Sequence, residues 1–370
     1  MVGEFTPLRV KEVRRETEDA STLFFEFPEG KRELFHYKPG QYITIRWKEG
    51  GKEFRRSYSI CSVPGDPFLA ITVKEVNKGK ISPKLTRNVK TGDLLEVFPP
   101  EGRFTTEFDP GKKRQIFLFG AGSGITPLMS ISRTALEAEP KSTVILLYGS
   151  RTEDQIIFRE AFDQLAERYK GQFFVYHTLS KPEGGGGLVK SLFGKKKPEW
   201  TGMKGRISAE RIKEVLDKHP GNRDQAIFFL CGPGDFITMG EKALSTIGIN
   251  EDLIKKEFFT PPSSEHPTHQ NEMTNKTPGH PSKVIVHLRG DRIEATVTNK
   301  TILDTLLDLG YDAPYSCHSG ACATCMARVI EGKVEMDACF ALSDKEVARG
   351  YILSCQSHPV TETLEITYDE

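Results

Sequence analysis

The chain of 370 residues is long enough for two to three domains. Its 51 Lys and Arg balance its 51 Asp and Glu, so net charge gives no reason to expect a nucleic acid or a membrane surface as a partner. No apolar run is long enough to span a bilayer and no secretory signal opens the chain, which predicts a cytoplasmic protein.

Residues 1–110 read as short strands separated by turns, without a long helical pattern between them. Turn signals such as Pro39-Gly40 and Pro64-Gly65 punctuate the region. This pattern is typical of an antiparallel β-barrel. The best strand candidates are residues 23–27, 42–47, 54–59, 70–76 and 94–98.

Residues 111–260 alternate between apolar strands and helices, which predicts an α/β domain with a parallel sheet. The expected strands are 115–119, 144–148, 173–177 and 226–231. The first expected helix ends near residue 137, and the other three cover 158–169, 209–218 and 235–247. A loop from 184 to 205 reads as a surface insertion. Its lysines at 195–197 either face solvent or dock an acidic partner.

Residues 261–282 contain Pro, Ser, Thr, His and Asn with almost no apolar side chains, which indicates a linker. Beyond it, residues 283–370 form a compact final module. Residues 284–288 and 292–297 are expected to form a hairpin, and 302–309 a helix.

Four cysteines in this last module have the spacing of a plant-type [2Fe-2S] site. Four residues separate Cys317 from Cys322, two separate Cys322 from Cys325, and 29 separate Cys325 from Cys355. The residues between the first three are small, so backbone amides can approach the cluster sulfurs. A structural zinc site usually presents two close Cys pairs or Cys and His pairs instead. His318 is interpreted as an exposed loop residue, since a Rieske site needs two histidine ligands.

A second motif, Arg56-Ser57-Tyr58-Ser59, lies on a predicted strand of the first domain. It resembles the Arg-x-Tyr-Ser flavin motif of the ferredoxin–NADP reductase superfamily. The resemblance implies that Arg56 pairs with a flavin phosphate, that the ring lies against Tyr58, and that Ser59 hydrogen-bonds its reactive edge. A guanidinium fork and an aromatic face suit these roles. A barrel strand with a core tyrosine and a surface arginine is the alternative.

The segment Lys80-Ile81-Ser82 resembles the second flavin segment of the same superfamily. There, backbone amides and a serine hydroxyl hold the pyrophosphate. Val73 and Lys74 are also among the cofactor-binding residues that the resemblance implies. It favours FAD over FMN, because members that bind FMN are the minority.

The second domain carries two motifs that resemble the nucleotide site of the superfamily. The glycine-rich turn with Gly122 and Thr126 follows an apolar strand and opens a helix, so its amides can face a pyrophosphate. Cys231-Gly232-Pro233 matches the Cys-Gly-Pro motif. The match implies that Cys231 lines the place where nicotinamide meets flavin, as an orienting group. A buried cysteine in a strand is the alternative.

The segment Glu257-Phe258-Phe259 resembles the terminal Glu-x-aromatic of these reductases. Phe259 would then cover the flavin face, and Glu257 would neighbour the ring. Phenylalanine departs from the tyrosine of plant-type members, which suggests easier displacement by nicotinamide. The predicted catalytic residues are Tyr58, Ser59, Cys231, Glu257 and Phe259.

Cofactor choice rests on polar and cationic side chains that follow the parallel strands. Ser150-Arg151, Ser180-Lys181 and Arg206 fall where NADPH-using members hold the adenosine 2′-phosphate. Cationic and hydroxyl groups suit a phosphate, and no acidic residue stands ready for a bare ribose. We therefore expect NADPH, with NADH as the alternative.

The order of flavin domain, nucleotide domain, linker and β-grasp ferredoxin resembles the reductase components of multicomponent oxygenases, particularly the phenylacetyl-CoA epoxidase type. The resemblance implies an NAD(P)H-dependent oxidoreductase that passes electrons through FAD and a [2Fe-2S] cluster to an oxygenase component. Alternative acceptors are a hybrid-cluster protein and a ring or fatty-acid hydroxylase. A standalone NADPH oxidase or quinone reductase is a further alternative, as is a sensing module fused to a decayed reductase, against which the intact motifs argue.

Overall fold

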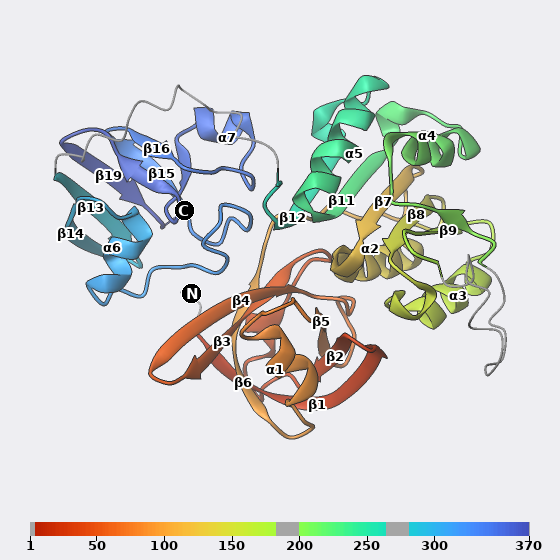
Figure 1. The fold of residues 1–370 in the computed structure, drawn as a ribbon, viewed down its shortest axis with the longest axis horizontal. Coiled ribbons are helices and arrows are strands. Elements are labelled where there is room, and N and C mark those ends of the chain that lie inside the picture. The colour runs from red at the N-terminus through yellow and green to blue at the C-terminus, as the bar shows by residue number, and fades with distance from the viewer. Residues whose placement is uncertain (1–3, 183–199, 264–280, 370) are drawn as a thin grey trace, which may run out of the picture.

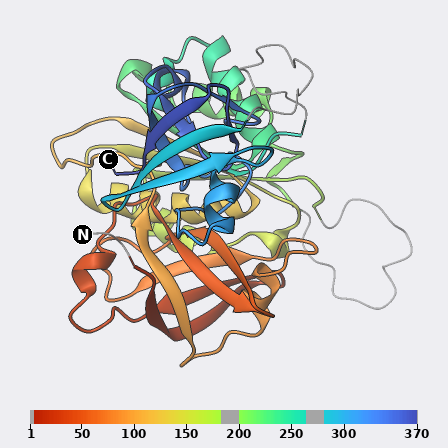
Figure 2. The same cartoon turned by 90° about the vertical axis from the view of Figure 1, so that its left-hand side faces the viewer.

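The computed structural model describes residues 4–182, 200–263 and 281–369. Figure 1 shows three bodies: a barrel at the bottom, an α/β layer structure on the right and a smaller sheet structure on the left. Turned by 90°, the barrel again lies below the other two bodies (Figure 2). The lysines at 195–197 and most of the predicted linker lie outside the described residues. Within the described ranges, no helix is long and apolar enough to cross a membrane.

The barrel is antiparallel, as predicted, and its sheet has six strands, the first of which was not among the five expected. Its strands are β1 (Thr6–Thr17), β2 (Ala20–Phe25), β3 (Tyr42–Glu49), β4 (Lys52–Ser59), β5 (Leu69–Lys74) and β6 (Leu94–Glu101). They neighbour one another in the order β4-β3-β6-β1-β2-β5, and a bridge between Ile60 and Ile71 joins the two ends. Alternate side chains such as Ile43 and Ile45 fill the interior. A short helix, α1 (Ser82–Arg87), follows β5.

The α/β body has a parallel sheet, as predicted, in the order β10-β9-β8-β7-β11-β12. Its strands are β7 (Gln115–Ala121), β8 (Thr143–Ser150), β9 (Phe173–Leu179), β10 (Met203–Lys204), β11 (Ile227–Pro233) and β12 (Ile254–Thr260). Its helices are α2 (Ile125–Ala138), α3 (Arg159–Arg168), α4 (Ala209–Lys218) and α5 (Gly234–Thr246). The predicted loop to residue 205 was too long, because β10 extends the sheet by pairing with β9.

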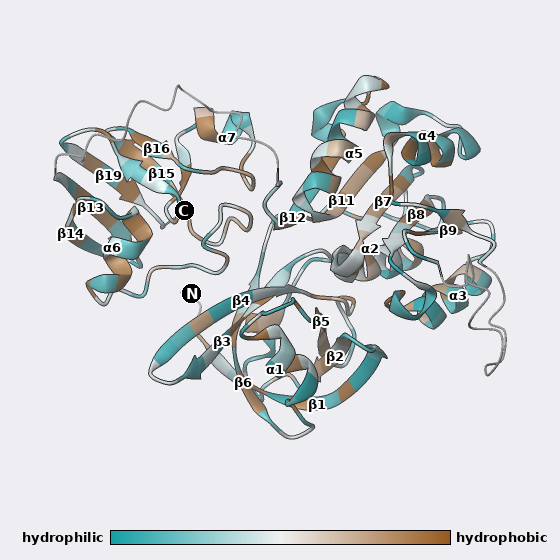
Figure 3. Ribbon diagram, viewed as in Figure 1, coloured by the Kyte–Doolittle hydropathy of each residue, from teal (hydrophilic) through white to brown (hydrophobic). Residues whose placement is uncertain are grey.

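Two hydrophobic cores cover the two faces of this sheet. Ile116 and Leu118 pack with side chains of α2 and α3, whereas Phe117 and Phe119 pack with side chains of α4 and α5. Successive residues of a strand point to opposite faces, so one continuous apolar run serves both cores. Strands β7 and β11 are accordingly brown over much of their length in the hydropathy colouring of Figure 3.

The C-terminal body has a five-stranded sheet in the order β14-β13-β19-β15-β17 and a small sheet of β16 and β18, consistent with the expected β-grasp. Its elements are β13 (Ser282–Leu288), β14 (Asp291–Val297), α6 (Ile302–Asp308), β15 (Met326–Glu331), β16 (Val334–Met336), α7 (Asp344–Ala348), β17 (Tyr351–Leu353), β18 (Ser357–Pro359) and β19 (Thr363–Thr367). The cysteine loop connects α6 to β15.

Candidate active site

Three predicted catalytic residues from different elements meet at one carboxylate oxygen. Ser59 ends β4, and its hydroxyl donates to Oε2 of Glu257 at 3.1 Å. Cys231, in β11, donates its thiol to the same oxygen at 3.7 Å. Cys231 and Glu257 are register partners in the parallel pair of β11 and β12. The structure therefore joins the barrel to the α/β body at residues that three separate motifs singled out.

Burial sets the protonation of this group. It raises the pKa of Glu257 from an ordinary 4.5 to about 7, against the hydrogen bonds from Ser59 and Cys231, which lower it. Burial also raises the pKa of the Cys231 thiol well above its ordinary value, and the Glu257 carboxylate raises it further. Cys231 therefore stays protonated near neutral pH, which suits an orienting group and not a thiolate nucleophile.

The glycine-rich turn lets the start of α2 approach β11 closely. A Cβ on Gly124 would lie 2.0 Å from the carbonyl oxygen of Cys231, so no side chain fits there. Gly122 has a φ of +58°, which glycine adopts readily. Thr126 is buried, and its hydroxyl donates to the carbonyl of Ser123 at 3.0 Å.

The flavin motif occupies the last half of β4. Arg56 is exposed and Tyr58 is half-buried, and the two lie on the same side of the strand because one residue separates them. Burial raises the pKa of Tyr58 above its ordinary value, so its hydroxyl stays neutral. An aromatic face next to an exposed guanidinium fits a planar ring that carries a phosphate.

The second flavin segment is more closed than the resemblance implies. Ile81 and Ser82 are buried at the start of α1, where Oγ of Ser82 accepts a hydrogen bond from the Val76 amide at 2.9 Å. Lys80 is exposed, and its ammonium lies 5.4 Å from the centre of the Phe54 ring. Ser82 thus holds the turn before α1, and only its hydroxyl proton remains for a pyrophosphate oxygen.

Val73 and Lys74, the other residues expected in this region, have side chains that are engaged within the barrel. Val73 is fully buried in the barrel core. The ammonium of Lys74 lies 3.5 Å from the carboxylate of Asp19. A cofactor contact at Val73 would therefore have to come from its backbone.

The residues expected to bind the 2′-phosphate share one edge of the parallel sheet. The Ser180 amide donates to the Ser150 carbonyl at 3.0 Å, and the Lys181 amide donates to the Arg151 carbonyl at 2.8 Å. Arg206 follows β10, which pairs with β9. Arg151, Lys181 and Arg206 are all exposed, so this edge presents three cations.

The remaining predicted residues surround the end of β11. Gly232 has a φ of +151°, which L side chains rarely adopt, and the exposed Pro233 leads into α5. Phe259 is half-buried against the core that faces α2 and α3. Phe258 packs on the opposite core, and its ring centre lies 6.1 Å from that of Phe340 in the C-terminal body.

The four cysteines of the predicted cluster site lie together. Cys317 interacts directly with Cys322 and Cys355, and Cys325 interacts with Cys355. The Ser319 amide donates to Sγ of Cys317 at 3.4 Å, as the small loop residues predicted. In the parts of the chain that the structure describes, no three His, Cys, Asp or Glu side chains surround a single ion position.

The cysteine loop lies against the strands that carry the flavin motif. The Ser57 amide donates to the hydroxyl of Ser316, just before the first cysteine, at 2.9 Å. The hydroxyls of Tyr42 and Thr324 are 2.8 Å apart, and Thr324 lies between two cysteines. The sequence did not predict these contacts, because residues far apart in the chain leave no periodic signal.

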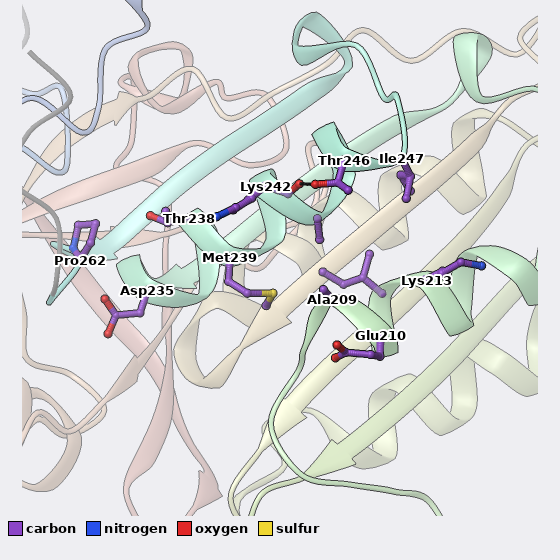
Figure 4. A pocket seen from close by; sticks show the side chains of 12 residues that line it. Ala209, Glu210, Lys213, Asp235, Thr238, Met239, Lys242, Thr246, Ile247 and Pro262 are labelled. Atoms are coloured by element: carbon purple, nitrogen blue, oxygen red, sulfur yellow. Dashed lines mark hydrogen bonds between the residues drawn. The ribbon is translucent and has the colours of Figure 1, made fainter.

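Two cavities adjoin these elements. The first, of about 630 Å³, lies between all three bodies and is lined by Glu101, Glu257 and Cys322 among others. The second, of about 560 Å³, is a groove between α4 and α5 whose lining includes Met239 (Figure 4). None of the predicted site residues lines this groove, whereas the first cavity is lined by Glu257 of the predicted catalytic set and by Cys322 of the predicted cluster site.

Three sequence families match the chain in succession. An oxidoreductase FAD-binding domain matches residues 7–106, an oxidoreductase NAD-binding domain matches 118–242, and a 2Fe-2S iron-sulfur cluster binding domain matches 286–360. These matches confirm the expected cofactors as FAD, NAD(P)H and a [2Fe-2S] cluster.

Solved structures with under 25% identity share the fold. An intact type IV self-sufficient cytochrome P450 monooxygenase aligns with a TM-score of 0.67 at 20% identity, over 98% of this chain and 41% of that one. The flavohaem-like FAD/NAD-binding domain of nitric oxide dioxygenase from Vibrio cholerae O1 biovar El Tor aligns with a TM-score of 0.56 at 23% identity, over 70% of this chain and 100% of that one.

Curated relatives match along the whole chain. A 1,2-phenylacetyl-CoA epoxidase component from Escherichia coli K12 is 32% identical over 99% of this chain and 98% of its own length. The ferredoxin reductase component of 3-ketosteroid-9-alpha-monooxygenase from Rhodococcus rhodochrous is 33% identical over 98% and 96%. The chain therefore belongs to the ferredoxin reductase-type family of oxygenase reductase components, in which FAD-binding, NAD-binding and 2Fe-2S domains follow one another.

Proposed function

We propose that this protein passes electrons from NADPH, through FAD and a [2Fe-2S] cluster, to the oxygenase component of a phenylacetyl-CoA epoxidase-type system. The observation that carries the proposal is the meeting of Ser59, Cys231 and Glu257 beside a cysteine loop that contacts the same strand. FAD, when bound, accepts a hydride and releases its electrons singly. The domains proposed for these steps are 1–110 for FAD, 111–260 for the nucleotide and 283–370 for the cluster, joined by a linker at 261–282.

The chain's own contribution is to bind and orient. Arg56 and Tyr58 hold the flavin on the outer side of β4, and Phe259 covers the ring. Ser59 and Glu257 form a hydrogen-bonded pair that can hold a proton at the carboxyl, because the pKa of Glu257 is about 7. Cys231, which is fully buried, fixes Glu257 from the other side.

The preference for NADPH over NADH is part of the proposal. Three exposed cations, Arg151, Lys181 and Arg206, lie at one edge of the sheet, and two serines lie beside them. A 2′-phosphate carries the charge that such an edge attracts. We also propose a cytoplasmic location, because the seven cysteines are all free, which suits a reducing compartment.

Reconstitution with the oxygenase components of a phenylacetyl-CoA epoxidase tests the choice of acceptor. NADPH consumption should depend on the oxygenase and on its acyl-CoA substrate, and epoxide should form in step with NADPH loss. NADPH loss at the same rate without the oxygenase would instead favour a standalone oxidase. If no epoxide formed but the protein supported turnover of a steroid or ring hydroxylase, the proposed acceptor would be wrong. The proposed electron path would still hold.

A further inference from the structure

Strand β4 presents two sides to its surroundings. Arg56 and Tyr58 lie on one side, where the flavin motif places the cofactor, and the Arg56 guanidinium also donates to the Ser316 carbonyl at 3.5 Å. Arg55 and Ser57 lie on the other side, and both contact the C-terminal body. Consecutive residues of one strand therefore contact both the predicted flavin site and the cysteine loop. These two sites lie far apart in the chain.

Arg55 is an enclosed charged group between the barrel and the C-terminal body. Its side chain is only 7% exposed, and its guanidinium binds Glu53 at 2.7 Å on its own strand and Asp312 across the interface. Arg289 also binds Asp312, at 3.1 Å, which fixes the carboxylate from the C-terminal side. Because the guanidinium is enclosed and Asp312 is 45% exposed, solvent screens their charged hydrogen bond from one side only.

Two aromatic rings hold the same guanidinium. Its central carbon lies 5.0 Å from the centre of the Phe5 ring in the barrel and 4.5 Å from the centre of the Tyr315 ring in the C-terminal body. Tyr315 is 9% exposed and comes two residues before the cluster cysteine Cys317. Arg55 is thus stacked directly on the start of the cysteine loop.

Two other ionic contacts of the C-terminal body with the rest of the chain are more exposed. Arg103 pairs with Glu346, and Lys345 pairs with Asp252. The more buried side chain is 25% exposed in the first pair and 67% exposed in the second, against 7% for Arg55. Exposed pairs of this kind contribute little and are screened by salt. The enclosed contact of Arg55 is therefore better suited than these two pairs to fix the loop to the strand.

We propose that Arg55 is a positioning residue that holds the cluster loop on the strand carrying the flavin motif, so that its loss slows reduction of the cluster and not reduction of the flavin. The inference rests on the proposed function. In the affected step, one electron leaves the flavin reduced by NADPH and converts one ferric iron of the cluster to ferrous. The second electron follows after the acceptor has reoxidised the cluster.

The chain contains a matched control. Arg46 is the cross-strand partner of Arg55, flanks the same Phe5 ring at 4.1 Å and binds a barrel glutamate, Glu96, at 2.7 Å. These contacts lie within the barrel. Arg46→Gln therefore removes a guanidinium from the same ring, with the same kind of local loss of stability. It keeps the contact of Arg55 with the C-terminal body.

The test compares Arg55→Gln, Asp312→Asn and Arg46→Gln in the cofactor-loaded full chain. Anaerobic stopped-flow mixing with NADPH gives separate rates for the bleaching of flavin and of cluster. Amide hydrogen exchange around residues 312–316 in the oxidised protein measures the contact itself, without any turnover. Asp312 is 45% exposed, so Asp312→Asn keeps the test possible if Arg55→Gln does not fold.

Arg55→Gln and Asp312→Asn should slow cluster bleaching by about tenfold or more, leave flavin bleaching within about twofold, and speed exchange at 312–316. Arg46→Gln should change none of these. Wild-type rates and exchange in both interface variants would overturn the inference, and so would equal losses in Arg46→Gln. A cluster that NADPH does not reduce even in the wild type would instead contradict the proposed function, and the exchange comparison would still decide the role of Arg55.

Discussion

At the scale of single residues, the site depends on the carboxyl of one half-buried glutamate. Glu257 receives hydrogen bonds from Ser59 and Cys231 on a single oxygen, and burial raises its pKa to about 7. Without its partners, a carboxyl with this burial would have a still higher pKa, since both hydrogen bonds favour the charged form. The group can therefore change protonation near neutral pH, where the proposed hydride transfer takes place.

The raised pKa of Glu257 predicts a pH dependence of stability. The unfolded carboxyl titrates near 4.5 and the folded one near 7, so the folded state holds the proton more tightly. Its contribution to stability is fully present below pH 4.5 and is lost as the pH rises through 7. Glu257→Gln should remove up to roughly 3 kcal/mol of this loss.

Urea unfolding of the variant and the wild type at pH 5 and at pH 8 measures the difference. Glu251→Gln, an exposed substitution just before β12, serves as the control and should leave the pH dependence unchanged. If Glu257→Gln lost as much stability as the wild type between the two pH values, the carboxyl would not be the buried group described above.

At the scale of elements, the turn before α2 fixes the distance between the helix and β11. Gly124→Ala puts a methyl group 2.0 Å from the Cys231 carbonyl and should destabilise the protein by roughly 3 kcal/mol or more. Gly122→Ala meets no atom within 4 Å and bears only the cost of a positive φ, about 1 kcal/mol. Thermal unfolding of the two variants gives the order directly, and equal losses would mean that the turn can relax away from β11.

Altering the cationic edge of the sheet should raise the KM for NADPH more than the KM for NADH. In the proposed NADPH complex, Arg206→Ala would remove a charged hydrogen bond to the 2′-phosphate worth about 1.5–3 kcal/mol. The KM for NADPH should then rise roughly 10- to 100-fold while the KM for NADH stays constant. Lys213→Ala, on α4, removes a cation that already pairs with Asp217 and should change neither value. Steady-state reduction of ferricyanide with both nucleotides measures this; equal rises for NADPH and NADH would show that Arg206 does not read the 2′-phosphate.

Elements that are apolar on both faces were predictable from sequence, and elements with charged or exposed faces were less so. The run at 115–119 serves two cores and was assigned as a strand, as β7 confirms. Strand β12 was not assigned, because Lys255 and Lys256 interrupt its apolar pattern. The resemblance to the superfamily named Ser59, Cys231 and Glu257 together. It could not name the contact of Arg55 with Asp312, whose partners stand 257 residues apart.

At the scale of the whole molecule, two exposed ion pairs join the C-terminal body to the rest of the chain, Arg103 with Glu346 and Lys345 with Asp252. They predict a limited effect of salt on docking of that body. The double variant Arg103→Ala/Lys345→Ala should weaken docking by less than about 2 kcal/mol, and that loss should disappear at about 0.5 M NaCl, where the wild-type pairs are screened. Small-angle scattering measures the radius of gyration at low and high salt. If the radius of gyration of the double variant rose with salt as much as that of the wild type, these pairs would not contribute to docking.

The contacts of Arg55, Ser57 and Tyr42 place the cysteine loop beside the residues proposed for hydride transfer. To deliver electrons to an oxygenase, a single molecule must hold the flavin and the cluster close to one another and within reach of the oxygenase. The order of the three domains and the cavity between Glu257 and Cys322 support this arrangement.

An anaerobic titration of the cofactor-loaded protein with NADPH, following flavin and cluster absorbance together, tests the central claim most directly. The account predicts that both absorbances bleach, and that the cluster bleaches without any added electron carrier. Bleaching of the flavin alone would contradict it, since the cysteine loop would then receive its electrons from another donor.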